Sequence, residues 1–227
     1  MRPDGIAVLT MPSWALYDSK WHWKAWLADR LDGLRGTSGL IVDLRGNEGG
    51  QDCGDAILAR LIESAYVPPA NEQRLRFRRT PAALDPFLDT WDDGFPTLGK
   101  GARSLPDGFF LRPSGDQALT IAPDAKRLGV PLHVLIGPVN SWATFQFAGN
   151  LRYIGGGNWR GINGGCFFLV RLPASGLEFD LPLVGYFPTV PQPDAGIIPD
   201  VTIATTAADI AAARDPVLER AVADLVA

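Results

Sequence analysis

The hydrophobic pattern near the start of the chain predicts strands that alternate with helices. Residues 6–9 and 40–44 are short, continuous apolar runs, typical of strands that are buried on both faces of a parallel sheet. Residues 17–34 carry apolar side chains at helical spacing, and a second helix is predicted to begin around Asp52. This order of elements favours an α/β fold with right-handed crossovers.

The rest of the chain resumes this pattern after an interruption. Prolines, aspartates and glycines punctuate residues 80–128, which predicts a long irregular insertion of the kind that often forms a lid. The later strands and helices are predicted at 130–136, 143–152, 166–172 and 177–183, with a last helix from about Ala207. We therefore expect a single domain over residues 1–227.

Composition and charge narrow the class of protein. Of the 227 residues, 46% are hydrophobic and 20% are charged, which is typical of a globular protein whose core needs no disulfides. The net charge of −4 argues against a nucleic-acid or anionic-membrane partner, because either requires a basic surface. The basic run at 74–79 alternates charged and apolar residues, which favours a strand with one charged face over a phosphate-binding patch.

The sequence predicts neither a membrane span nor a signal peptide. No apolar run approaches about 18 residues, and the N-terminus lacks the basic-then-apolar layout of an export signal. Met1 is followed almost at once by a predicted strand, so one interpretation is that the chain is a fragment of a longer precursor. No oligomeric state or compartment is assigned.

No metal or cofactor site is predicted. Cys53 and Cys166 share no metal-type spacing and are interpreted as two free thiols. His22 and His133 cannot build a zinc site without several carboxylates. The Gly-rich segment 155–165 follows a helix and enters a strand, whereas a dinucleotide-binding loop follows a strand and opens a helix, so it is interpreted as a tight loop near a cleft.

Two loops at the ends of predicted buried strands are candidates for chemistry. Gly49 and Gly50 precede the second helix, where adjacent backbone N–H groups can stabilise an oxyanion; a tight strand-to-helix turn would need the same glycines. Ser141 begins the helix that follows the strand at 130–136, where a nucleophilic hydroxyl would be exposed near the helix dipole. Asn140 or Ser141 is equally an ordinary N-cap.

Three motifs occur in order along nearly the whole chain. They are Gly-Leu-Ile-Val-Asp-Leu-Arg-Gly-Asn-Glu-Gly-Gly at 39–50, the strand at 134–137 that leads into Ser141-Trp142-Ala143, and Gly-Ile-Ile-Pro-Asp-Val at 196–201. Together they resemble the catalytic core of the C-terminal processing (tail-specific) serine peptidase family. The resemblance implies a ClpP/crotonase-like core of mostly parallel β-strands with flanking helices. The PDZ-like domain of many members is not expected in this chain.

The resemblance also implies an activity. Members hydrolyse peptide bonds in polypeptide substrates through a serine nucleophile, without a metal or cofactor, and full-length relatives are expected to be exported. Gly49 or Gly50 fits the oxyanion-hole position, together with the N–H of the residue after the nucleophile. Ser141 is the candidate nucleophile of a serine-type hydrolase.

The sequence departs from the family pattern at two positions. When Phe147 and Ala148 are aligned with the family's helix, Trp142 rather than Ser141 occupies the nucleophile position. The family's catalytic lysine has no counterpart, and the corresponding region offers Arg160. An indole cannot attack a carbonyl, and arginine stays protonated. The alternative is therefore a catalytically inactive member that binds peptide or apolar ligands, with Trp142 and Arg160 as ligand contacts.

Overall fold

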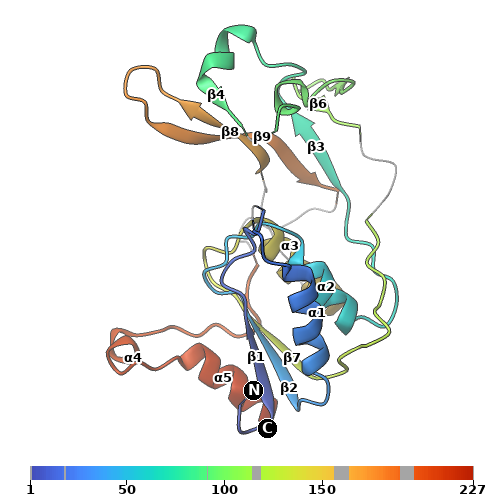
Figure 1. Cartoon of the computed structure of the whole chain (residues 1–227), viewed down its shortest axis with the longest axis vertical. Coiled ribbons are helices and arrows are strands. Elements are labelled where there is room, and N and C mark those ends of the chain that lie inside the picture. The colour runs from blue at the N-terminus through green and yellow to red at the C-terminus, as the bar shows by residue number, and fades with distance from the viewer. Residues whose placement is uncertain are drawn as a thin grey trace. The chain divides into compact units, whose positions relative to one another are not determined.

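The computed structural model describes residues 2–17, 19–90, 92–113, 119–155, 164–189 and 197–226, without the side chains of 152–155 and 164–167. The chain divides into two compact units (Figure 1). Unit 1 comprises Met1–Val67, Thr120–Trp159 and Ala195–Ala227, and unit 2 comprises Pro68–Leu119 and Arg160–Asp194. Among the described helices, none is long and apolar enough to cross a membrane.

Unit 1 is a three-layered α/β structure. Its elements are β1 (Ile6–Thr10), α1 (Trp23–Gly33), β2 (Gly39–Asp43), α2 (Cys53–Leu61), β7 (Leu132–Leu135), α3 (Trp142–Gly155), α4 (Ala207–Ala211) and α5 (Pro216–Val226). The three strands form a parallel sheet in the order β1-β2-β7, with Thr10 opposite Asp43 and Asp43 opposite Leu135. The predicted strands and helices of this unit are confirmed with two differences: α1 begins later than the pattern indicates, and the last helix, predicted from about Ala207, is divided into α4 and α5.

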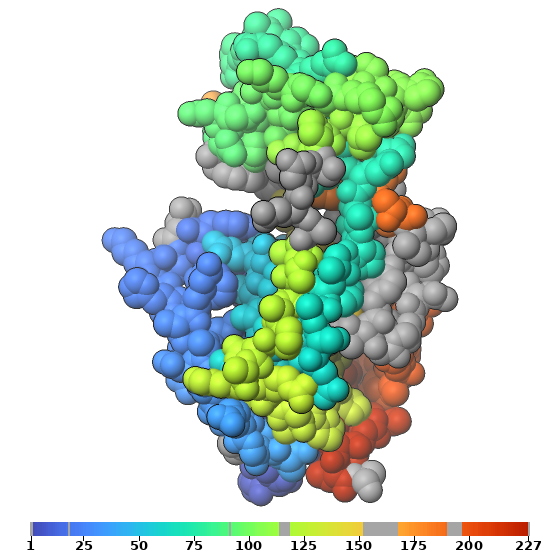
Figure 2. All heavy atoms as spheres, turned by 90° about the vertical axis from the view of Figure 1, so that its right-hand side faces the viewer, coloured from blue at the N-terminus to red at the C-terminus, as the bar shows by residue number. Residues whose placement is uncertain are grey.

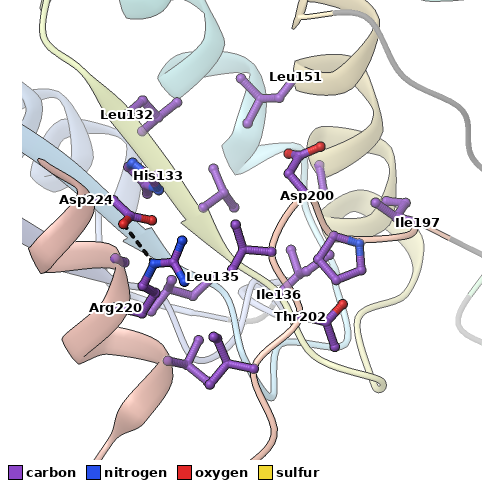
Figure 3. Close-up of a pocket in the computed structure, with 17 residues that line it drawn as sticks. Leu132, His133, Leu135, Ile136, Leu151, Ile197, Asp200, Thr202, Arg220 and Asp224 are labelled. Atoms are coloured by element: carbon purple, nitrogen blue, oxygen red, sulfur yellow. Dashed lines mark hydrogen bonds and ion pairs between the residues drawn. The ribbon is translucent and has the colours of Figure 1, made fainter.

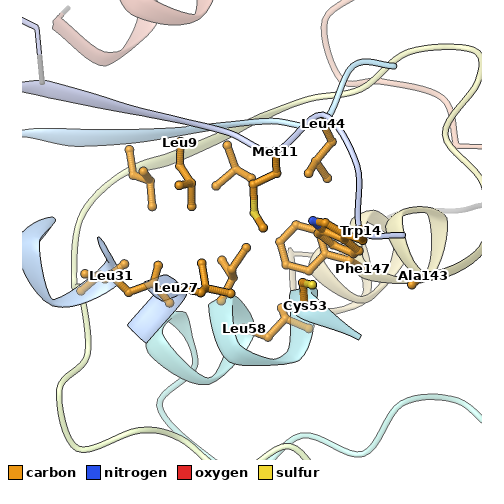
Figure 4. Close-up of a cluster of buried hydrophobic side chains, with 14 of the residues drawn as sticks. Leu9, Met11, Trp14, Leu27, Leu31, Leu44, Cys53, Leu58, Ala143 and Phe147 are labelled. Atoms are coloured by element: carbon orange, nitrogen blue, oxygen red, sulfur yellow. The ribbon is translucent and has the colours of Figure 1, made fainter. Parts of the chain in front are cut away.

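Both faces of this sheet are covered by helices (Figure 1). On one face, α1, α2 and α3 pack over the strands around a core that includes Trp14 and Phe147, whose rings meet edge to face at 5.7 Å (Figure 4). On the other face, α5 covers Ile6, Ile41 and Leu135. This double coverage explains why β2 is buried along its whole length and apolar up to its last residue, Asp43.

Unit 2 is built on an antiparallel sheet. Its strands are β3 (Asn71–Leu75), β4 (Leu88–Asp89), β5 (Arg103–Ser104), β6 (Phe110–Leu111), β8 (Gly164–Arg171) and β9 (Glu178–Pro188), in the order β4-β8-β9-β3-β6-β5. Two 3-10 helices, Ala82–Phe87 and Phe95–Thr97, lie between the short strands. Its core comprises Leu75, Phe95, Ala102, Phe168, Leu183 and Val184.

The expectation of mostly parallel strands is therefore wrong outside unit 1. β8 and β9 are joined by a short turn in which Leu172 N–H donates to the Leu177 carbonyl, and so short a connection can join only antiparallel strands. The segment expected to be an irregular insertion at 80–128 also contains β4, β5 and β6, which pair with strands of this sheet. Strands of two residues are too short to show an alternating pattern in the sequence.

The segment by which the chain leaves unit 1 pairs with the segment by which it returns. Tyr66 and Ile121 exchange backbone hydrogen bonds of 2.9 and 2.8 Å as an antiparallel bridge. In Figure 2 the teal segment near Tyr66 and the yellow-green segment near Ile121 run side by side over the surface. The buried Arg60 guanidinium also holds the returning segment against α2, because it pairs with Asp124 and donates to the Lys126 carbonyl.

Candidate functional site

The loops that follow the three parallel strands of unit 1 meet at one edge of the sheet. Parallel strands place their carboxyl ends on the same side, which is where open α/β sheets bind ligands. Residues 11–14 follow β1, residues 44–50 follow β2 and residues 136–142 follow β7. The predicted site residues Gly49, Gly50 and Ser141 are thus brought together from loops that are far apart in sequence.

Asn47 is the central hydrogen-bonding residue of these loops and is completely buried. Its Nδ2 donates to the Met11 carbonyl at 2.7 Å, and its Oδ1 accepts from Gly49 N–H at 2.8 Å. Its own carbonyl lies 2.8 Å from Asn140 Nδ2 and 3.0 Å from Thr144 Oγ1. One side chain and its backbone therefore connect all three loops. Nothing in the sequence pattern indicated this role.

Asn140 fastens the same loops from the β7 side. Its Nδ2 also donates to the Leu44 carbonyl at 2.6 Å, and its Oδ1 accepts from Gly137 N–H at 2.7 Å. The residue therefore does more than cap a helix, because it joins the ends of β2 and β7. A polar residue directly before a helix was the only signal in the sequence, and that signal points to a cap.

Gly49 and Gly50 adopt backbone conformations that side chains disfavour, with φ of 95° and 132°. A Cβ on Gly49 would lie 2.6 Å from the Ser141 carbonyl oxygen and 2.7 Å from Trp142 Cβ. A Cβ on Gly50 would lie 2.2 Å from the Trp14 carbonyl oxygen. Glycine is therefore required at both positions for the loops to approach so closely.

The backbone N–H groups of the two glycines differ in availability. Gly49 N–H is already engaged by Asn47 Oδ1. Gly50 N–H has no hydrogen-bond acceptor among the described residues, while its neighbour Gln51 donates to the Trp14 carbonyl. Of the two predicted oxyanion donors, Gly50 is the one whose N–H is left to bind an incoming oxygen.

Ser141 and Trp142 occupy the turn from β7 into α3. The Ser141 hydroxyl donates to the Glu48 carbonyl at 2.7 Å. Trp142, the first residue of α3, has φ of 52°, a left-handed conformation that is rare for a large side chain. Strained positions of this kind cluster at active sites, where a sharp strand-to-helix turn presents one side chain outward. Here the residue at the strained position is tryptophan.

Other ionisable groups lie in or near these loops, and the carboxylates of Glu48 and Asp52 are exposed. Cys53 at the start of α2 is completely buried, and burial together with the nearby Asp52 raises the pKa of its thiol to about 11. His22 is exposed at the N-terminus of α1. Arg160, the predicted ligand contact, lies outside the described residues. Among the described residues there is also no cluster of metal-binding side chains.

Arg45 ties the loop after β2 to the start of α5. Its guanidinium contacts both carboxylate oxygens of Asp43, at 2.9 and 2.6 Å, and both of Asp215, at 2.8 and 2.7 Å. These hydrogen bonds raise the pKa of Arg45 and hold the pKa of Asp215 below its ordinary value of 3.8. The paired geometry fixes the backbone just before Gly46 to Gly50.

Because its pKa is lowered in the folded state, Asp215 contributes stability that is present above about pH 4 and is lost as the pH falls through the lower, folded value. We expect Asp215→Asn to lower the free energy of unfolding by about 1 kcal/mol at neutral pH, since the pair is partly exposed. The difference from wild type should shrink in strong acid. Urea unfolding over a pH series measures the difference in unfolding free energy between the variant and wild type. Asp29→Asn, at an exposed position, is the control and should not reproduce this difference. If Asp215→Asn lowered the unfolding free energy equally at all pH values, the result would contradict the pairing of Asp215 with Arg45.

A separate pocket of about 580 Å³ lies beside β7 (Figure 3). His133 of β7 and the Arg220–Asp224 pair of α5, joined at 2.7 Å, lie on one side, and Ile197 and Asp200 lie on the other. None of Gly49, Gly50, Ser141 and Trp142 lines it. Part of the motif at 196–201 therefore borders this pocket rather than the candidate site.

Comparison with known proteins agrees with this geometry. The sequence model of peptidase family S41 matches residues 5–165, and the chain belongs to peptidase family S41. This confirms the resemblance to the C-terminal processing peptidases. No curated protein matches the chain.

The chain is also similar to several solved structures. The chain is similar to a putative peptidase from Parabacteroides merdae ATCC 43184, with a TM-score of 0.58 and 20% identity over 100% of this chain and 63% of that one. It is similar to a mutant of CPAF, with a TM-score of 0.59 and 18% identity over 90% of this chain and 47% of that one. The photosystem II D1 C-terminal processing protease matches with a TM-score of 0.42 and 15% identity, over 87% of this chain and 42% of that one. The chain thus spans less than two thirds of each.

Proposed function

We propose that this chain is a polypeptide-binding member of peptidase family S41, with a ClpP/crotonase-like core in which the loops of the candidate site are kept and the family's nucleophile and catalytic lysine are lost. The observation that carries the proposal is Trp142. It has φ of 52° at the first residue of the helix after β7, and its Cβ faces Gly49. This is the position at which the resemblance to the family implies the attacking serine.

The chemistry of the side chain excludes nucleophilic attack at that position. An indole N–H is a hydrogen-bond donor only and has no lone pair to offer a carbonyl carbon. A flat aromatic side chain at a loop edge can instead contact apolar or aromatic residues of a bound polypeptide. The Gly50 N–H, which has no acceptor among the described residues, would then serve as a donor to a peptide carbonyl rather than to an oxyanion.

A serine-type peptidase that uses Ser141 is the second candidate. It is favoured by the position of Ser141 at the start of α3, beside Gly49 and one residue before the strained turn. In this structure the hydroxyl proton is held by the Glu48 carbonyl, which can accept a hydrogen bond but cannot act as a general base. Hydrolysis through Ser141 would require that bond to break and a base to approach.

Fluorophosphonate labelling followed by peptide mapping distinguishes the two candidates. We expect no stoichiometric label on the wild-type chain, no cleavage of an unfolded polypeptide, and measurable binding of that polypeptide. In Trp142→Ser, label at residue 142 would show that the framework can still activate a serine. Ser141→Ala is the matched control and should behave as wild type. Stoichiometric label at Ser141 in the wild-type chain would contradict the proposal and support the peptidase.

A further inference from the structure

Three arginines at alternate positions of unit 2 each lie against a phenylalanine ring. The guanidinium carbons of Arg74, Arg76 and Arg78 lie 4.4, 3.6 and 4.9 Å from the ring centroids of Phe187, Phe109 and Phe110, respectively. All three distances are within the range of cation–π attraction. We call these three arginines the arginine ladder. They belong to the basic run for which the sequence predicted a charged face.

The arginine ladder is held in place before any partner binds. Arg74 pairs with Glu72 at 2.6 Å and with Asp107 at 3.2 Å, and Arg78 donates to Ser104 Oγ at 3.1 Å. Two of the supporting rings, Phe109 and Phe187, contact each other edge to face at 5.6 Å. Long side chains that are already ordered lose less conformational entropy when they bind a partner.

Charge on this face is not balanced. Arg103 lies in the same cross-strand row, because Arg74 and Arg103 both pair with Leu111. Among the described residues, Glu72 and Asp107 pair with Arg74, and no carboxylate pairs with Arg76, Arg78 or Arg103. The net charge of the chain is −4, but this surface is locally positive. We therefore expect an anionic partner to be attracted to this surface rather than to the rest of the molecule.

We propose that the arginine ladder binds an extended, acidic segment of a polypeptide, with carboxylates at alternate positions. Arg74 is already engaged by Glu72 and Asp107, whereas the guanidinium groups of Arg76 and Arg78 pair with no described carboxylate. Each of these two can match a carboxylate of the partner through two parallel hydrogen bonds. An extended chain directs every second side chain to one face, at intervals of about 6.6 Å. Alternate acidic residues on the partner therefore correspond to alternate arginines on this chain.

Nucleic acid fits this surface less well. Single-stranded nucleic acid is bound by stacking bases on exposed aromatic rings. Here the rings of Phe109, Phe110 and Phe187 are covered by guanidinium groups. The net charge of −4 also repels a polyanion whose charge extends beyond the ladder. The proposal does not depend on whether Trp142 has silenced the candidate site, which lies in unit 1.

Fluorescence anisotropy with the full chain tests the inference. The probe is a labelled synthetic peptide in which Glu and Ala alternate, and the comparison probes are a peptide that alternates Lys and Ala and a single-stranded DNA of equal charge. We expect the Glu–Ala peptide to bind, with affinity falling as salt rises. The Arg76→Gln/Arg78→Gln variant should bind at least about tenfold more weakly, because two charge-assisted contacts are lost.

A matched control separates local recognition from net charge. Lys20→Gln/Arg35→Gln removes the same charge from exposed positions of unit 1 and should change the affinity less than about twofold. Arg76→Lys/Arg78→Lys keeps the charge and the fold but loses the paired geometry, so it should bind with intermediate affinity. Absence of binding, equal losses in the ladder and control variants, or DNA binding as tight as that of the Glu–Ala peptide would each overturn the proposal.

Discussion

Gly50→Ala is expected to cost unit 1 about 3–4 kcal/mol of unfolding free energy, a larger loss than most single substitutions produce. Two effects add. The φ of 132° is unfavourable for any side chain, and the new Cβ would lie 2.2 Å from the Trp14 carbonyl oxygen and 2.5 Å from Ala15 N. These are backbone atoms of the loop after β1, so relief requires two loops to separate rather than one side chain to rotate.

Gly46→Ala is the matched control for this substitution. Gly46 lies in the same loop with φ of 79°, but a Cβ there would meet no atom within 4 Å. Its expected loss is about 1 kcal/mol, the cost of left-handed backbone alone. Urea unfolding followed by circular dichroism measures both variants. Equal losses at Gly46 and Gly50 would show that the loops do not pack as closely as the structure indicates.

The same loop shows how far sequence pattern can carry a site prediction. Gly49, Gly50 and Ser141 could be predicted to lie together because they follow strands whose apolar runs indicated a parallel sheet. Which N–H is available could not be predicted. That depends on Asn47 Oδ1, which takes up Gly49 N–H and leaves Gly50 N–H without a described partner.

The fold of unit 2 was harder to predict from the sequence, for a similar reason. β8 and β9 were predicted as strands, but β3, the second pairing partner of β9, lies far away in the sequence, with Asn71 opposite Pro188. Long-range antiparallel pairing leaves little local signal, whereas the buried strands of unit 1 are evident from short apolar runs. The alternation of the basic run at 74–79 predicted a charged face. The contacts of its arginines with phenylalanine rings could not be predicted, because Phe109 and Phe187 come from other parts of the chain.

Asn47→Ala is expected to lower the unfolding free energy by about 3 kcal/mol. The substitution leaves two buried partners, the Met11 carbonyl and Gly49 N–H, without the hydrogen bonds they now make at 2.7 and 2.8 Å. A buried group that loses its partner costs about 1–3 kcal/mol. Asn71→Ala, at an exposed position of β3, should change stability by no more than about 0.5 kcal/mol. Urea midpoints of the two variants give the comparison.

Asn47 also connects the stability of this region to its proposed function. If Trp142→Ser can be labelled by fluorophosphonate, then adding Asn47→Ala should reduce that labelling at least about tenfold, because the freed loop no longer holds Gly49 against the turn at residue 142. The rate should fall under conditions where circular dichroism still shows folded protein. Labelling that is unchanged by Asn47→Ala would mean that the three loops form the site without this side chain, and that Asn140 alone fixes their positions.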